Sequence, residues 1–301
     1  MKRVLIIITT IVITLTTISC NKVEKIKGYT VYNVTSWSSY IPNQEKIVSL
    51  STYKKKEKKG EIIKYNIGEN VITLEYFQTT KYEVNLQDLD YYNATHINDN
   101  EIKTTSDFDK FQLRFLANGK PCAILDPEQK ILNLTTAMSA PKETIADVVK
   151  QYYNQNLKAV FGVELDETYD KVEMWKSGYH DIYNVILSNS DLSEQGFADF
   201  IGFRFVDYGI LRGVWVVKMD PELKEYDKYP SDKDVLPDIK AHIKTYLPEE
   251  SRLNGCEIKS KYFIVYNDKI CGLYTVTADI SGAAGYYGSE QTILVELDTL
   301  D

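Results

Sequence analysis

The spacing of hydrophobic and polar positions changes several times along the chain, and each spacing predicts a different element. The first stretch, 4–18, is apolar apart from its threonines and directly follows Lys2 and Arg3. At about 1.5 Å per residue such a helix spans about 22 Å, short of the ~30 Å hydrocarbon core of a bilayer. A positive start before a short apolar segment is typical of a signal peptide, which predicts one over 1–19.

The end of this apolar stretch carries a cysteine in a specific context. Residues 17–20 read Thr-Ile-Ser-Cys and resemble the lipobox of bacterial lipoproteins, with Thr17 where that family usually has leucine. The resemblance implies that Cys20 is acylated and becomes the first residue of the mature chain. We therefore expect a lipid-anchored, extracytoplasmic protein on a bacterial cell membrane. The alternative is a cleaved secretory signal with a coincidental cysteine.

The next two regions differ in their periodicity. Residues 20–45 are polar with little periodicity, which predicts a tether between the membrane and the folded part. Within 46–140, apolar and polar residues alternate, as in 71–77 and 81–86, around a reversal at Thr79. Alternation with period two is typical of strands with one buried face. A mostly antiparallel β unit is therefore predicted over 46–140.

Two later segments carry apolar residues at the three- and four-residue spacing of an amphipathic helix. The first follows Pro141, and the second follows the candidate cap Asp234 and ends at Pro248. Strand patterns follow both helices. The unit over 141–230 and the unit over 231–301 are each predicted to contain one helix followed by an antiparallel β-meander.

The strands after the two helices resemble each other. Residues 203–220 align with 262–279, which places Gly213 opposite Gly272 and an aspartate seven residues after each glycine. A repeated strand, turn and strand predicts equivalent antiparallel hairpins, each packed on the helix before it. We expect the two glycines where a larger side chain would collide with the helix or bend the strand.

These patterns together predict an α+β fold of tandem helix-plus-meander modules, preceded by a mostly β N-terminal unit. The hairpin with its glycine and aspartate after a helix resembles the PepSY family of small bacterial extracytoplasmic domains. The resemblance covers about half of the mature chain and implies modulation of peptidases or sensing at the cell envelope. It implies no functional residue, because none of the matched positions is chemically distinctive.

The net charge of the chain narrows the classes of molecule that we expect it to bind. The chain has 35 Lys+Arg against 43 Asp+Glu, a net charge of −8. Phosphate-backbone binding needs clustered basic residues, so no nucleic-acid partner is expected. The one basic run, 54–60, is interpreted as a solvated hairpin tip, with contact to anionic lipid headgroups as the alternative.

Residues with catalytic or metal-binding chemistry are scattered. The histidines His96, His180 and His242 have no metal-ligand spacing, and Asp238 four residues before His242 predicts a solvent-facing ion pair. Neither a metal nor another cofactor is expected. An acidic segment, 88–101, could ligate calcium but lacks the EF-hand pattern, which favours a loop.

Two carboxylate pairs, Asp126 with Glu128 and Asp220 with Glu222, recur in Asp-Pro-Glu sequences within 119–130 and 213–224. Recurrence at one structural position favours a turn role over a glycosidase pair.

The cysteines beyond the leader give little chemistry. Cys122, Cys256 and Cys271 have no CxxC spacing and are interpreted as small buried residues, with a Cys256–Cys271 disulfide left open.

A glycine-rich segment, 281–289, joins two strand patterns, 275–280 and 292–297. Its nine residues, three of them glycine, exceed what a reversal of the chain needs. Tyr286 and Tyr287 place large amphipathic rings on this predicted loop, so both are candidate binding residues.

The leading functional hypothesis is a non-catalytic, membrane-anchored lipoprotein that binds or modulates another envelope component, either a protein or a glycan. The first alternative is a hydrolase of polysaccharide or peptide that uses an Asp/Glu pair, which a raised carboxyl pKa in a cleft would favour. The second is a purely structural envelope protein, which would have a surface without concave pockets.

Overall fold

The fold is that of a computed structural model, which describes residues 28–36, 44–104, 106–177, 181–207, 209–225, 229–282 and 285–299. The predicted signal peptide and Cys20 lie outside the described residues, as does His180.

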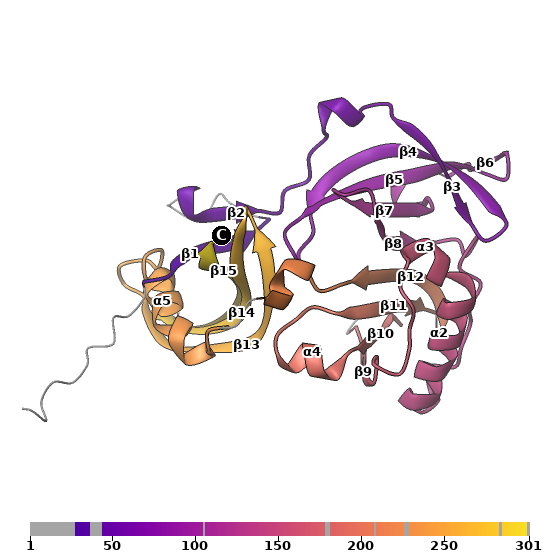
Figure 1. Cartoon of the computed structure of the whole chain (residues 1–301). Coiled ribbons are helices and arrows are strands. Elements are labelled where there is room, and N and C mark those ends of the chain that lie inside the picture. The colour runs from indigo at the N-terminus through magenta and orange to yellow at the C-terminus, as the bar shows by residue number, and fades with distance from the viewer. Residues whose placement is uncertain are drawn as a thin grey trace, which may run out of the picture.

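Two β-sheets give the protein a small lobe and a large lobe (Figure 1). The small lobe contains the five strands of one sheet, in the order β13-β14-β15-β1-β2, and helix α5. Its elements are β1 (Thr30–Thr35), β2 (Ile47–Ser49), α5 (Asp232–Lys244), β13 (Arg252–Tyr266), β14 (Lys269–Gly282) and β15 (Gly285–Thr299). The 3-10 turn η2 (Gln44–Lys46) precedes β2.

The large lobe contains a ten-stranded sheet in the order β3-β4-β5-β7-β8-β12-β11-β10-β9, with β6 paired to β5. The strands are β3 (Ile62–Ile67), β4 (Asn70–Lys81), β5 (Asp88–Ile97), β6 (Asn100–Glu101), β7 (Gln112–Leu116), β8 (Pro121–Leu125), β9 (Lys171–Lys176), β10 (Tyr183–Ser188), β11 (Phe200–Val206) and β12 (Ile210–Val217). The helices are α2 (Lys142–Asn156), α3 (Lys158–Phe161) and α4 (Ser190–Glu194), with 3-10 turns η3 (Lys56–Lys58), η4 (Asp107–Asp109) and η5 (Pro221–Glu225).

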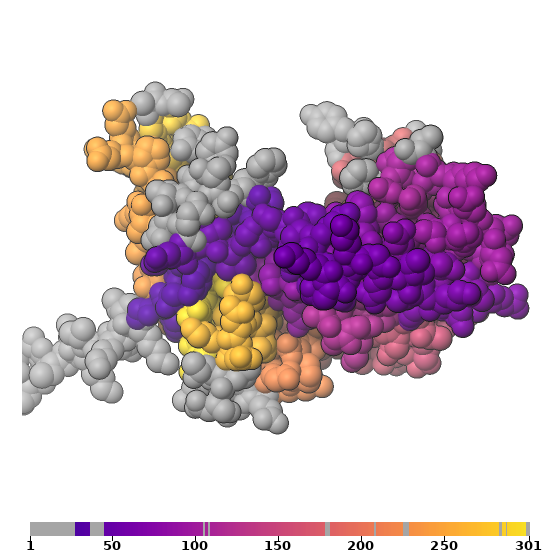
Figure 2. Space-filling view, turned by 90° about the horizontal axis from the view of Figure 1, so that it is seen from above, coloured from indigo at the N-terminus to yellow at the C-terminus, as the bar shows by residue number. Residues whose placement is uncertain are grey.

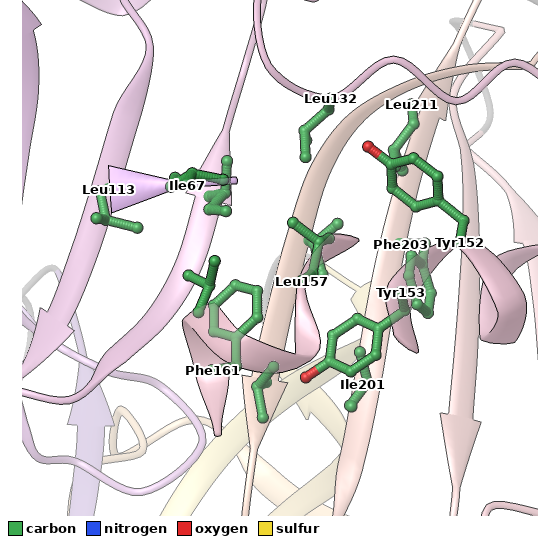
Figure 3. Close-up of a cluster of buried hydrophobic side chains, with 14 of the residues drawn as sticks. Ile67, Leu113, Leu132, Tyr152, Tyr153, Leu157, Phe161, Ile201, Phe203 and Leu211 are labelled. Atoms are coloured by element: carbon green, nitrogen blue, oxygen red, sulfur yellow. The ribbon is translucent and has the colours of Figure 1, made fainter. Parts of the chain in front are cut away.

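Helices α2 and α3 cover one face of the large sheet. Ile145, Val149 and Tyr153 follow helical spacing and are fully buried. The ring of Tyr153 stacks on Phe161 of α3 and meets Phe203 of β11 edge to face (Figure 3). Burial of this apolar stripe, rather than local helix propensity, holds α2 on the sheet.

In the small lobe, α5 packs on the face of the five-stranded sheet that carries Tyr274 and Val276. Ser231 caps the helix in a capping box with Asp234, so the cap predicted at Asp234 lies three residues earlier. His242 is buried in α5, and Asp238 instead accepts a hydrogen bond from the N–H of Tyr29. The predicted solvent-facing ion pair is wrong.

The predicted tandem modules are also wrong, because strands dominate the fold and the two sheets cut across the predicted units. β8 from 46–140 pairs with β12 from 141–230, with Leu125 opposite Gly213, and both belong to one sheet. β1 lies within the predicted tether, yet it pairs with β15 at the other end of the chain. Local patterns reveal strands but not which distant strand each one joins.

The predicted hairpins are confirmed as antiparallel pairs, β11 with β12 and β13 with β14. The role expected for the two glycines in these hairpins is not confirmed. A Cβ on Gly213 would lie 3.5 Å from the carbonyl oxygen of Ile124, an ordinary contact, whereas one on Gly272 would lie 2.3 Å from the ring of Tyr274. Neither position meets a helix.

Two further local predictions fail because strands run longer than their patterns suggest. The reversal expected at Thr79 is absent, since β4 continues through it to Lys81. The acidic segment 88–101 is not a loop but forms β5 and β6.

The basic run contains η3 and does not form a hairpin tip. Lys55 binds Asp88 at 3.1 Å, and Lys58 binds the fully buried Asp90 at 2.6 Å. These ion pairs fold the run onto β5.

Candidate functional site

The two lobes lie side by side: orange and yellow mark the C-terminal part of the small lobe, purple and magenta mark the large lobe, and indigo runs from one to the other (Figure 2). Two hollows lie on the face of the large sheet opposite α2, with volumes of about 450 Å³ and 620 Å³. Trp215 of β12 lines both. We call these the first and second hollow, and together the interlobe groove.

Small side chains form the floor of the first hollow. Ala123 of β8 and Gly213 of β12 line it, on neighbouring paired strands at the centre of the large sheet. A residue with a large side chain at either position would fill the space. Gly213, which the sequence singled out for helix packing, therefore keeps this hollow open.

One wall of the first hollow is a polar row on β5 and β7. The guanidinium of Arg114 lies 4.4 Å from the centre of the Tyr91 ring, a cation–π contact that orients it. Its Nε donates to Gln112 Oε1 at 2.8 Å, and Gln112 Nε2 donates to Asn93 Oδ1 at 3.0 Å. The planar charge of Arg114 is thus held in place from two sides.

The opposite wall is formed by Trp215 and Arg204. The indole lies over Gly202, its cross-strand partner, where a Cβ would come within 2.1 Å of the ring. The indole therefore lies against the sheet, and Trp215 is only partly buried. Arg204 is exposed beside it and lines the same hollow.

The charges of the two hollows differ. In the second hollow Lys171 binds Glu173 at 2.9 Å and Lys261 binds Asp232 at 3.0 Å. Among the described residues, no carboxylate forms an ion pair with the arginines of the first hollow. A protein with a net charge of −8 thus carries two guanidinium groups in one hollow, and Glu83, which also lines it, forms no ion pair with either among the described residues.

The connection between β4 and β5 covers the first hollow, together with Ser36 and Leu50 of the small lobe. Tyr82 lies in this connection, and its hydroxyl is buried without a hydrogen-bond partner among the described side chains. Burial raises the pKa of Tyr82 above its usual range. The neutral hydroxyl is thus available as a donor beside the arginines.

The thiols do not suit nucleophilic chemistry. Cys122, Cys256 and Cys271 are free, so the disulfide left open by the sequence is not formed. Burial raises the pKa of Cys122 and of Cys271 to about 12, which keeps both thiols protonated at neutral pH. No cluster of three or more metal-ligating side chains occurs within the described ranges.

The first repeated carboxylate pair has a structural role at Asp126. Asp126 is fully buried and accepts hydrogen bonds from the N–H groups of Lys130, Ile131 and Leu132 at 2.9, 2.6 and 2.7 Å. This is the turn role predicted for it.

The second pair is more exposed. Burial, followed by the neighbouring Glu222, raises the pKa of Asp220 to about 6, and Asp220 lowers the pKa of Glu222. Neither residue lines the groove or the further hollow of about 500 Å³ that β1 and β15 line.

The predicted loop over 281–289 is instead mostly strand. β14 and β15 continue toward each other until Gly282 pairs with Gly285, and Ser281 pairs with Tyr286. Tyr286 is 67% exposed at this hairpin end and does not line the groove. Tyr287 lies in β15, opposite Ile280.

Arg114, Arg204 and Trp215 were missed by the sequence reasoning. A signal for the arginines exists, since each interrupts a short apolar strand: QLRFL in β7 and FIGFRFV in β11. A charged residue at the outward position of a central strand marks a polar face. That the two faces meet in one groove depends on the pairing of β8 with β12.

Comparison with protein-family models, with curated proteins and with solved structures gives no match. Within the part of the chain that the structure describes, no helix is long and apolar enough to cross a membrane.

Proposed function

We propose that this chain is a non-catalytic binding protein, held by an acylated Cys20 on the outer side of a bacterial cell membrane, that captures another envelope component in its interlobe groove. The observation that carries the proposal is the first hollow, where Arg114 and Arg204 stand without carboxylate partners beside a partly exposed indole. Convergent polar groups around an otherwise open cavity are the usual features of a ligand site.

The two alternatives have less support. A hydrolase needs an acid and a base facing one cavity, and Asp220, whose carboxyl pKa is raised, lies outside all three hollows. Of the four carboxylates that line the second hollow, three form ion pairs with lysines: Glu173, Asp199 and Asp232. A purely structural protein gains nothing from oriented charges in a hollow. Binding without catalysis accounts for the two arginines and the indole of the first hollow.

Photo-cross-linking in intact cells tests the binding. A photoreactive residue at Val84, which lines the first hollow, should capture one defined envelope component. The same residue at Val71, exposed on β4 and outside the hollows, is the matched control. Gly213→Phe fills the floor and should abolish capture from position 84. Equal capture from both positions, or capture that survives the filled floor, would refute the proposal.

The anchor is tested separately by metabolic labelling with a clickable palmitate. The wild-type chain should be labelled and should sediment with membranes, whereas Cys20→Ala should remain unlabelled. Equal labelling of both chains would exclude Cys20 as the acylated residue and leave the groove unaffected.

A further inference from the structure

The position of the first hollow limits the shape of its ligand. Its floor strands, β8 and β12, are central in the large sheet, and each has a partner on both sides. Their backbone groups are used within the sheet, so an extended peptide cannot add to it as another strand. Recognition here must come from side chains, which favours a compact ligand with polar groups on its rim.

The arginines define the charge of the ligand. A guanidinium presents a planar fork of donors that matches a carboxylate or a phosphate group. Arg114 on β7 and Arg204 on β11 are three strands apart. At ~4.8 Å per strand their backbones are separated by about 14 Å, so the two charges suit a ligand longer than a single small anion.

Trp215 defines the body of the ligand. Its indole lies against Gly202, and the side chain borders both hollows. A flat apolar ring with polar side chains around it suits the C–H face of a sugar ring, whose hydroxyl groups then point to the polar rim. A chain of sugar units lying across Trp215 would continue from the first hollow into the second.

We infer that the groove binds an acidic oligosaccharide, with one sugar ring stacked on Trp215 and anionic substituents held by Arg114 and Arg204. Tyr82 lies beside this path and offers its buried hydroxyl as a donor to a ring substituent. This inference rests on the proposed function and adds the ligand class. The anionic group can be a carboxylate or a phosphate, since the arginine fork accepts both.

Titration calorimetry with the full chain in detergent solution tests the inference. The probes are a galacturonic acid trisaccharide, maltotriose, maltotriose with a terminal phosphate, and a hexa-aspartate peptide. At least one anionic sugar should bind at least tenfold more tightly than neutral maltotriose and than the peptide. Tighter binding of the first sugar identifies carboxylate as the anionic group, and tighter binding of the phosphorylated sugar identifies phosphate.

Matched variants locate the binding. Arg114→Gln and Arg204→Gln should each lower the affinity for the anionic sugar about tenfold, the usual cost of a lost charged hydrogen bond. Arg252→Gln, exposed on β13 and outside the hollows, should change nothing. Trp215→Leu should lower the affinity for charged and for neutral sugars alike. Circular dichroism checks that this variant folds.

The inference is overturned if neither anionic sugar binds, if the peptide binds as tightly, or if the arginine variants match the wild type. Cross-linking from position 84 still distinguishes failure of the ligand class from failure of the proposed binding function. Specific capture of an envelope component without acidic sugar would keep the proposed function and discard the ligand class. Loss of specific capture would discard both.

Discussion

The hairpins β11–β12 and β13–β14 align in sequence, yet they turn the matching aromatic residue to opposite faces. Trp215 points away from α2 and lies over Gly202 in the groove. Tyr274, its aligned counterpart, lies over Gly272 in the buried cluster beneath α5. Both rings cover a glycine on their own sheet. One ring faces the groove, and the other is fully buried in a core.

A single β-bulge accounts for the difference. Leu211 and its counterpart Ile270 are both buried in their helix-facing clusters. β12 then carries one extra residue, Arg212, between the paired positions Leu211 and Gly213. Because side chains alternate along a strand, one extra residue moves every later side chain to the other face. The bulge therefore converts a core position into a groove position.

Truncating the two aromatic residues gives the largest predicted contrast. Tyr274→Ala removes a fully buried ring and should lower the free energy of unfolding by about 3–5 kcal/mol. Trp215→Ala removes a partly exposed ring and should cost about half as much, while ligand binding is lost. Urea denaturation of both variants, followed by far-ultraviolet circular dichroism, measures the two changes in the free energy of unfolding. Equal losses would mean that the two faces are energetically alike.

The repeated Asp-Pro-Glu sequence gives a second contrast. Asp126→Ala leaves three N–H groups without their acceptor, that of the buried Leu132 among them, and should cost about 2–4 kcal/mol. Asp220 accepts a long hydrogen bond of 3.4 Å from Glu222 N–H, and its other carboxyl contact is with the Glu222 side chain, so Asp220→Ala should cost less than about 1 kcal/mol. Thermal unfolding of both variants checks the order, and the reverse order would contradict the assigned role of Asp126.

The sequence predicted those parts of the fold that depend on nearby residues. The helical stripe after Pro141, the hairpin pairing of β11 with β12 and the turn role of Asp126 all follow from local spacing or local hydrogen bonds. The joining of β8 to β12 and of β1 to β15 does not. Such pairing depends on contacts between distant segments, to which a repeat within one chain gives no guide.

The site was less predictable than the fold for the same reason. Arg114, Trp215 and Arg204 lie on three strands, β7, β12 and β11, and only the order of the sheet brings them to one groove. Tyr286 attracted attention because glycines surround it. Those glycines lie in or beside a hairpin whose strands continue almost to its tip.

The third contrast concerns the aligned glycines. Gly272→Ala places a methyl group within 2.3 Å of the Tyr274 ring, and such overpacking should cost about 1–3 kcal/mol. Gly213→Ala makes only ordinary contacts, the closest at 3.5 Å, and should change stability by about 0.5 kcal/mol or less. Chemical denaturation at one pH compares the pair directly. A larger loss for Gly213→Ala would show that the groove floor is more tightly packed than its geometry indicates.

The smallest predicted contrast is between the pH ranges over which the two lobes lose stability in acid. In the small lobe, burial and then the charge of Lys46 lower the pKa of His242 from about 6.5 to about 4. The unfolded chain therefore binds a proton that the native lobe excludes, and stability is lost as the pH falls from about 6.5 to about 4. In the large lobe, hydrogen bonds from Lys81 and then Tyr53 and Lys55 outweigh desolvation and lower the pKa of Asp88 to about 2.

Asp88 therefore contributes stability that is lost only between about pH 4 and pH 2, as its carboxylate becomes protonated. Hydrogen exchange at pH 5 should be faster in β13 and β14, relative to the intrinsic rate, than at pH 7, with β4 and β5 unchanged. His242→Leu should remove this loss in the small lobe, and Asp88→Asn should leave it in place. Simultaneous loosening of both lobes at pH 5 in the wild type would mean that the lobes unfold as one cooperative unit, and that His242 does not set a separate acid limit for the small lobe.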